Sequence, residues 1–350
     1  MSRGGGRKEQ EAAAEVGHPR ATTALLGHAE AERDLLEAYR SGRIHHAWLI
    51  GGSPGIGKAT LAYRMARFVL AHPDPAVPAV QRASTLAVDP EHPVARRINA
   101  RSHADLLVLE RTESDSGALR TVIPVDEVRR TIGFFGSTAA AGGWRVCIVD
   151  SADELKSPEA PNALLKVLEE PPARTLFLVV SHAPGRLLPT IRSRCRRLTL
   201  RPLTPADVAA AIAVALGRSP GDGEVEKAAA LAEGSVARAI TLLGGPALAV
   251  RERVAGMLAA LPQVDGMALH ALGDLLGRAD SGTFETFVDT LRDWLSSRLT
   301  AYAGDTARLA QVAEVWDKLA RAAREVEVFN LDRKPLVFAA FGLMAETARR

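Results

Sequence analysis

The stretch Gly52-Ser53-Pro54-Gly55-Ile56-Gly57-Lys58-Ala59 decides the fold of this chain. It nearly fits the phosphate-binding loop (P-loop), in which glycines let backbone N–H groups surround phosphates and a lysine reaches the β- and γ-phosphates. The apolar run Ala47–Gly52 leads into it, and Thr60–Ala71 follows with apolar residues at helical spacing. Because a P-loop needs a strand before it and a helix after it, we predict a nucleotide-binding loop here. Its binding residues would be Gly52, Gly55, Gly57 and Lys58.

The metal side of this predicted site departs from the pattern. The Ser or Thr that binds Mg²⁺ after the lysine is Ala59, and Thr60 lies about 100° further around the helix. The apolar run Val146–Val149 ends at Asp150, which would orient Mg²⁺ through a water. The next position, where a carboxylate would activate the attacking water, is Ser151. We therefore predict a degenerate site that includes Thr60 and Asp150 but holds no metal.

Strand-like and helix-like segments alternate through the first two thirds of the chain, which predicts a parallel sheet covered on both faces. Pro124 opens a helix whose apolar face includes Val128 and Ile132. The apolar runs typical of buried strands are Ala47–Gly52, Leu106–Leu109, Arg145–Val149 and Thr175–Val180.

After about Arg201 every periodic segment is helical. Thr204 is a typical helix cap, since Pro205 fits the first helical position. The run Gly244-Gly245-Pro246 is typical of a hinge. The predicted parts are a disordered tail at 1–20, an α/β P-loop domain at 21–201, a small helical domain at 202–245 and an all-α domain at 246–350.

Composition limits the class of protein. With 47% hydrophobic residues and 24% charged residues, the chain can build sizeable cores, and no apolar stretch approaches the ~18 residues of a membrane span. Residues 1–20 lack the apolar stretch and cleavage site of a signal peptide. Two cysteines, Cys147 and Cys195, are too few for a disulfide framework or a four-cysteine zinc site. These features predict a cytoplasmic protein with no membrane partner.

A local basic stretch suits phosphates, either of a nucleotide or of DNA. Between Pro171 and Ala206 the chain has seven arginines and no acidic residue. The alternative is a solvated face beside the acidic surface of a partner protein.

Three further stretches carry a resemblance to a known family. They are Leu187-Leu188-Pro189-Thr190-Ile191-Arg192-Ser193-Arg194-Cys195, the run Asn162–Pro172 and the run Ile123–Arg129. With the P-loop they resemble the bacterial clamp-loader family of AAA+ proteins, over about residues 20–245. The resemblance implies an AAA+ domain, a helical lid domain and an all-α collar domain that joins subunits. It also implies that Arg194 of the Ser-Arg-Cys motif is catalytic in trans, on the ATP of an adjacent subunit.

Departures from the ATPase (gamma/tau) subunits of this family favour its delta-prime group. Those subunits keep a Thr and a Glu where this chain has Ala59 and Ser151, and they carry a sensor arginine where it has Ala237. The expectation is a stator subunit of the DNA polymerase III holoenzyme with no ATPase activity of its own. An active gamma/tau-like ATPase is the alternative, and a regulatory or DNA-binding module that kept the fold is a third possibility.

The resemblance also implies the partners. They are the delta and gamma/tau subunits and, through the complex, the sliding clamp and primed DNA. Whether Lys58 and the glycines still hold ATP or ADP weakly stays open. Related subunits often carry a four-cysteine zinc module, but Pro73–His103 contains no cysteine, so we predict no zinc and either a shortened loop or a small hairpin there.

Overall fold

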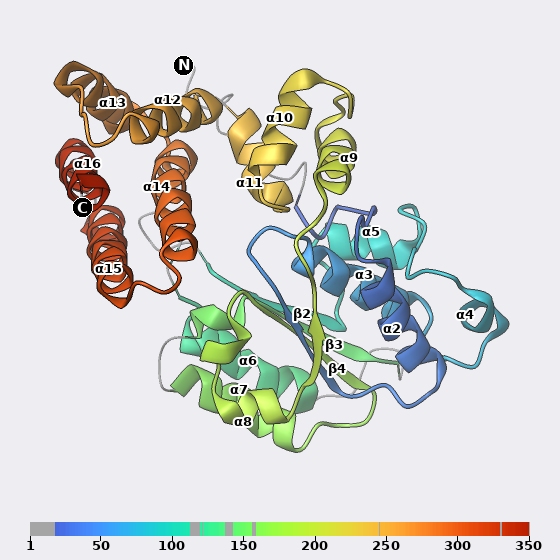
Figure 1. Ribbon diagram of the computed structural model, residues 1–350. Helices are drawn as coiled ribbons and strands as arrows, with labels where there is room; N and C mark the ends of the chain where they lie inside the picture. Colours follow the sequence, from blue (N-terminus) through green and yellow to red (C-terminus); the bar gives the residue numbers. More distant parts are fainter. Residues whose placement is uncertain are drawn as a thin grey trace, which may run out of the picture. The chain divides into compact units, whose positions relative to one another are not determined.

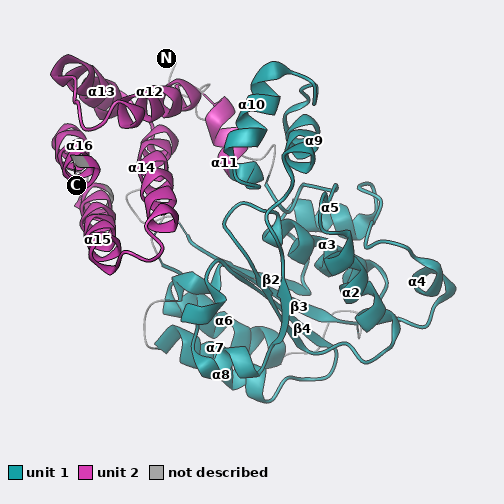
Figure 2. Ribbon diagram, viewed as in Figure 1, with its two compact units in different colours: residues 1–237 teal, residues 238–350 magenta. Residues whose placement is uncertain are grey.

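The computed structural model forms two compact units, residues 1–237 and residues 238–350 (Figure 2). The predicted boundaries after residues 201 and 245 stay predictions. Most of the predicted tail and one residue of the predicted hinge lie outside the described residues. The structure describes residues 18–112, 120, 122–136, 143–155, 159–244, 246–329 and 331–349.

A five-stranded sheet forms the centre of the first unit (Figure 1). Its strand order is β2-β3-β4-β1-β5, and every neighbouring pair is parallel, which confirms the predicted α/β P-loop fold with a parallel sheet. The strands are β1 Ala47–Gly51, β2 Leu106–Glu110, β3 Arg145–Asp150, β4 Thr175–Ser181 and β5 Arg196–Thr199. The sequence did not predict β5, which is an edge strand whose only buried residue is Leu198.

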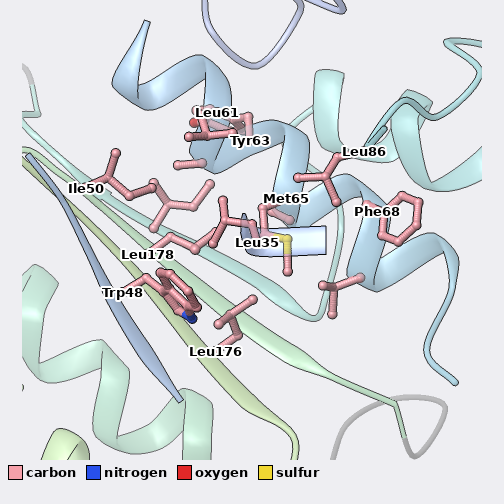
Figure 3. Packing of buried hydrophobic residues seen from close by; sticks show 14 of the residues in the cluster. Leu35, Trp48, Ile50, Leu61, Tyr63, Met65, Phe68, Leu86, Leu176 and Leu178 are labelled. Carbon is pink, nitrogen blue, oxygen red and sulfur yellow. The ribbon is translucent and has the colours of Figure 1, made fainter. Parts of the chain in front are cut away.

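Alternate residues of each strand enter two different cores, because successive side chains of a strand point to opposite faces. Trp48 and Ile50 pack on one face, whereas Leu49 packs on the other. The first face is covered by α2 Ala29–Arg40, α3 Lys58–Ala71, α4 Pro78–Arg82 and α5 Pro93–Asn99, and the second by α6 Val125–Gly136, α7 Glu159–Glu169 and α8 Pro189–Ser193. Figure 3 shows part of the first core, with Leu61, Met65 and Phe68 of α3 beside Trp48, Ile50, Leu176 and Leu178 of the strands.

Two local predictions on this domain were wrong. In α6 the residue Ile132 is 47% exposed, because the buried face of the helix consists instead of Val128, Thr131 and Phe135. Thr131 tolerates burial since its hydroxyl donates to the Val128 carbonyl at 2.6 Å. The segment 73–103 forms the two short helices α4 and α5 in place of a bare loop or a hairpin.

After β5 the described residues contain helices and no further strand, as predicted. Three of them follow the sheet: α9 Pro205–Leu216, α10 Gly223–Leu231 and α11 Val236–Leu243. The Thr204 side chain caps α9 by accepting from the Asp207 N–H, with Pro205 at the first helical position. The first two residues of α11, Val236 and Ala237, belong to the first unit.

The second unit has its own apolar core, to which every one of its long helices contributes. These helices are α12 Ala247–Ala259, α13 Gly266–Arg278, α14 Ser281–Ala301, α15 Thr306–Phe329 and α16 Lys334–Arg349. Asp293 of α14 forms ion pairs with Arg238 and with Arg251. In the part of the chain that the structure describes, no helix combines the length and the apolar character that crossing a membrane requires.

Candidate nucleotide-binding site

The P-loop lies where the sequence predicts, between β1 and the first residue of α3. All three predicted loop glycines have positive φ: Gly52 at 150°, Gly55 at 72° and Gly57 at 99°. At Gly55 the packing is tight as well, because a Cβ there would lie 2.2 Å from the Ser235 Oγ. A side chain at Gly55 is therefore excluded by both the backbone and its neighbours.

Lys58 is turned onto its own loop. Its ammonium donates to the carbonyl oxygens of Gly52 at 2.8 Å and Ser53 at 2.5 Å, and the residue is only 3% exposed. Burial lowers the pKa of Lys58 to about 8, against the opposing charges of Asp150 and Asp153. To reach a phosphate, this ammonium would have to leave the loop carbonyls.

Two other segments of the first unit engage the remaining loop carbonyls. The N–H groups of Val236 and Ala237 donate to the Gly55 carbonyl at 2.9 and 3.3 Å. The His28 Nε2–H donates to the Ile56 carbonyl at 2.7 Å, and burial lowers the pKa of this histidine. The loop is thus closed by the start of α11, by the residue before α2 and by its own lysine.

Sequence reasoning missed these closing contacts. The sequence draws attention to Ala237 only because it replaces a sensor arginine. In the structure, the backbone N–H of Ala237 is what contacts the loop, at the Gly55 carbonyl. His28 is a single histidine in no recognisable motif, so the sequence carries no signal for it. Arg238, the arginine one position later, pairs with Asp293.

The acidic side of the site gathers at the carboxyl ends of β2 and β3. Asp150 is the last residue of β3, and its register partner is Glu110 of β2. Burial and, to a smaller extent, the charge of Glu110 raise the pKa of Asp150 to about 6, against the opposing charges of Lys58 and Arg111. Ser151 follows as predicted and is buried.

Asp153, the first carboxylate after Ser151, is bound to the backbone and does not stand free to replace the missing general base. Asp153 accepts the N–H groups of His182 at 2.6 Å and Ala183 at 3.0 Å, and the Ser181 hydroxyl at 3.0 Å. Burial alone would raise the pKa of Asp153, but these hydrogen bonds outweigh it and lower the pKa. Asp153 therefore serves to fix the chain after β4.

A polar cavity of about 550 Å³ lies beside Asp150. Among the described residues its lining includes Asp150 and Ser151 but none of the loop residues 52–58. Two ion pairs lie among the residues that line it: Arg111 is 3.2 Å from Glu154, and Arg101 is 3.6 Å from Glu110. This open space therefore adjoins the end of β3 and does not include the P-loop.

The side chains around the P-loop offer few ligands for a metal ion. Thr60 is half-buried in the first turn of α3, one position after the lost ligand Ala59. Within the described ranges, no group of three or more His, Cys, Asp or Glu residues is placed to hold a metal ion. The absence of bound metal and of zinc stays a prediction.

Arg194 lies at the other edge of the sheet from the P-loop. It follows α8 and comes two residues before β5, which is parallel to β1 and pairs Arg196 with Trp48. The P-loop follows the carboxyl end of β1, so the length of the strands separates the P-loop from Arg194. The four residues of β5 alone span about 13 Å at ~3.3 Å per residue. The structure thus groups Gly52, Gly55, Gly57, Lys58, Thr60 and Asp150 and leaves Arg194 apart.

Comparison with known proteins shows the family to which this chain belongs. A family model described as "DNA polymerase III, delta subunit" matches residues 27–204, about half of the chain, including the P-loop, Asp150 and Arg194. This chain belongs to that family. The match confirms the resemblance found in the sequence and ends directly before α9.

Curated relatives match over part of their length. DNA polymerase III subunit delta' of Pseudomonas aeruginosa is 39% identical over 43% of this chain and 41% of its own length. The delta' subunit of Escherichia coli is 31% identical over 68% of this chain and 66% of its own length. The gamma/tau subunit of Mycobacterium tuberculosis is 31% identical over 56% of this chain and 31% of its own length. The chain therefore matches between two fifths and two thirds of the delta' relatives.

Proposed function

We propose that this chain acts as the delta-prime subunit of a DNA polymerase III clamp loader. In this role it helps to place the sliding clamp on primed DNA in the cytoplasm, as a stator that turns over no ATP itself. Its Arg194 completes the ATP site of a neighbouring ATPase subunit. Family membership supports the place in DNA polymerase III.

The position of Arg194 is the observation that carries this proposal. Because β5 and β1 are parallel, Arg194 lies near the amino end of these strands, whereas the P-loop of the same chain follows the carboxyl end of β1. Arg194 therefore cannot serve that loop. An arginine that stabilises a transferring phosphoryl group must touch it. An ATP on which Arg194 acts must therefore be bound by another subunit.

The closed P-loop supports the absence of ATP turnover. Five hydrogen bonds from Lys58, His28, Val236 and Ala237 hold its carbonyls. The Mg²⁺ ligand and the general base are replaced by Ala59 and Ser151. To contact a bound nucleotide, Lys58 would first have to leave the Gly52 and Ser53 carbonyls, and the nucleotide would then lack the machinery for hydrolysis.

We propose delta and gamma/tau subunits as direct partners, and the sliding clamp and primed DNA as partners through the complex. The closeness to gamma/tau proteins such as that of M. tuberculosis favours a second candidate, an active gamma/tau-like ATPase. The two candidates differ in whether the isolated chain hydrolyses ATP.

ATP turnover by the chain alone and by the reconstituted loader, each with and without Arg194→Ala, tests the proposal. We expect an inert isolated chain and a loader that slows sharply on the substitution, since an arginine supplied in trans is worth about 10³–10⁵ in kcat in GTPases. Turnover by the isolated chain that disappears with Lys58→Ala would establish the ATPase candidate. If the isolated chain is inert and the loader with Arg194→Ala hydrolyses ATP at the normal rate, the chain would act only as a scaffold.

A further inference from the structure

We propose that Glu169 positions Arg194 for its contact with the neighbouring subunit's nucleotide. This inference rests on the proposed role of Arg194 in trans and names a residue that supports it. Glu169 is the last residue of α7, whereas Arg194 directly follows α8, so the two come from different elements.

Two anchors hold the Arg194 guanidinium. Its Nη2 lies 2.7 Å from the Glu169 Oε1, and its Nη1 donates to the Thr190 carbonyl at 3.0 Å. The first distance is at the short end for an arginine–carboxylate pair. Because the guanidinium is planar, anchors on both terminal nitrogens fix the direction in which the plane faces.

The anchored guanidinium keeps donors for a ligand. An arginine has five N–H donors, and one contact at each terminal nitrogen leaves the others, including that on Nε, for phosphate oxygens. The Arg194 side chain is 34% exposed and Glu169 is 49% exposed, so a partner can approach the pair without unfolding either helix. The geometry therefore presents Arg194 to the outside in a fixed orientation.

Positioning matters because a long arginine side chain has many rotamers when it is free. Ordering it before the partner binds removes that entropy loss from the step in which the phosphoryl group is transferred. The size of the effect is bounded, since an exposed ion pair changes an equilibrium by up to roughly five-fold. Glu169 should therefore tune the action of Arg194, and Arg194 should carry most of it.

The next residue offers a matched control. Glu170 is exposed and has the same charge, and no ion pair or hydrogen bond to it is recorded among the described residues. An effect of general charge on the partner would appear in both glutamates. A positioning effect belongs to Glu169 alone.

The test measures clamp- and DNA-stimulated ATP turnover of the reconstituted loader carrying Glu169→Gln, Glu169→Asp, Glu170→Gln, Arg194→Ala or the double variant Glu169→Gln/Arg194→Ala. We expect Glu169→Gln to lower kcat by about two- to five-fold with KM for ATP unchanged, since the exposed pair is lost. Glu169→Asp should recover part of that loss, and Glu170→Gln should match the wild type. The double variant should equal Arg194→Ala, because Glu169 acts only through the arginine.

The outcomes separate this inference from the proposed function. A Glu169→Gln loader as fast as the wild type or faster, beside a slow Arg194→Ala loader, would overturn the positioning role and leave the trans-acting arginine standing. A double variant slower than Arg194→Ala would show that Glu169 acts elsewhere and would also overturn it. An Arg194→Ala loader of normal speed would remove both. Because both glutamates are exposed, their variants should assemble, and the melting temperature of each isolated chain checks that.

Discussion

The backbone N–H of Val236 donates to the Gly55 carbonyl at 2.9 Å, so the start of α11 is bonded directly to the P-loop. The first N–H groups of a helix have no partners within the helix and form a ready site for a phosphate. In α11 two of them bind a protein carbonyl, since Ala237 donates to the same oxygen at 3.3 Å. The P-loop therefore serves as an attachment point for Val236 and Ala237, the two residues of α11 that belong to the first unit.

This attachment predicts that Gly55→Ala destabilises the chain. The added methyl would require a non-glycine residue at φ 72° and would meet the Ser235 Oγ at 2.2 Å. The left-handed backbone alone costs about 1–3 kcal/mol, and the displaced start of α11 adds to it. The melting temperature should fall by several degrees.

The matched control is Gly133→Ala in the middle of α6, where an added Cβ meets nothing within 4 Å. A helix interior favours Ala over Gly by roughly 0.5–1 kcal/mol, so this variant should melt at a slightly higher temperature than the wild type. Equal melting temperatures for Gly55→Ala and the wild type would mean that the contact between α11 and the loop does not hold in solution.

The closed loop also predicts weak nucleotide binding. To reach a phosphate, the Lys58 ammonium would have to give up its two hydrogen bonds to the Gly52 and Ser53 carbonyls. At about 0.5–1.5 kcal/mol net for each bond, this loss would weaken binding by roughly 5- to 150-fold relative to a P-loop whose lysine is free. Isothermal titration of the isolated chain with ADP should therefore detect an affinity no tighter than the sub-millimolar range. Micromolar binding that Lys58→Ala abolishes would contradict the closure.

Much of the sheet could be predicted from the sequence because β1, β3 and β4 are buried on both faces and read as apolar runs, and because β2 is also an apolar run although only alternate residues of it are fully buried. The strand β5 could not, since its sequence Arg196-Arg197-Leu198-Thr199 has one buried residue and forms at the sheet edge next to β1. The helix face of α6 was misjudged for a related reason. A threonine with a satisfied hydroxyl occupies the buried stripe, and the apolar Ile132 lies outside it.

The residues of the candidate site were predictable only where a motif has a fixed spacing. The glycines and Lys58 lie between the end of β1 and the start of α3, and Asp150 is the last residue of β3. They lie at one edge of the sheet because β1 and β3 are parallel strands of it. The contacts of His28 with Ile56 and of Glu169 with Arg194 join residues that are 28 and 25 positions apart. Such pairs depend on how helices pack on the sheet, which a single sequence does not reveal.

The buried imidazole of His28 predicts an acid-sensitive P-loop. Burial lowers its pKa, Lys58 lowers it further, and Asp207 of α9 together with the hydrogen bond to Ile56 opposes the shift. A histidine whose pKa is lower in the folded state binds fewer protons there than in the unfolded chain. Its contribution to stability is present above about pH 6.5 and is lost as the pH falls below that value.

His28→Gln removes this titration and keeps an N–H donor for the Ile56 carbonyl. We expect the melting temperature of the variant to fall less than that of the wild type between pH 7.5 and pH 5.5. Thermal melts at both pH values, in one buffer of constant ionic strength, measure the difference. An equal fall for both proteins would show that His28 is not neutral in the folded chain.

The second unit should depend on Asp293, which pairs with two arginines from other helices. Its carboxylate lies 3.1 Å from the Arg251 Nη2 and also accepts from Arg238. The side chains of Arg251 and Asp293 are 11% and 26% exposed, so Asp293→Ala would remove the carboxylate from two ion pairs that water screens poorly. We expect a loss of about 1–3 kcal/mol in the free energy of unfolding, measured by urea titration.

Asp289→Ala, one turn earlier on α14, is the control for that loss. Asp289 also pairs with an arginine, Arg292, at 3.4 Å, but both side chains are 40% exposed. An exposed pair of this kind contributes about 0–1 kcal/mol because water and salt screen it. The urea midpoint should therefore move little for Asp289→Ala and clearly for Asp293→Ala. Equal shifts for the two variants would mean that the double ion pair adds nothing beyond the helix propensity of alanine.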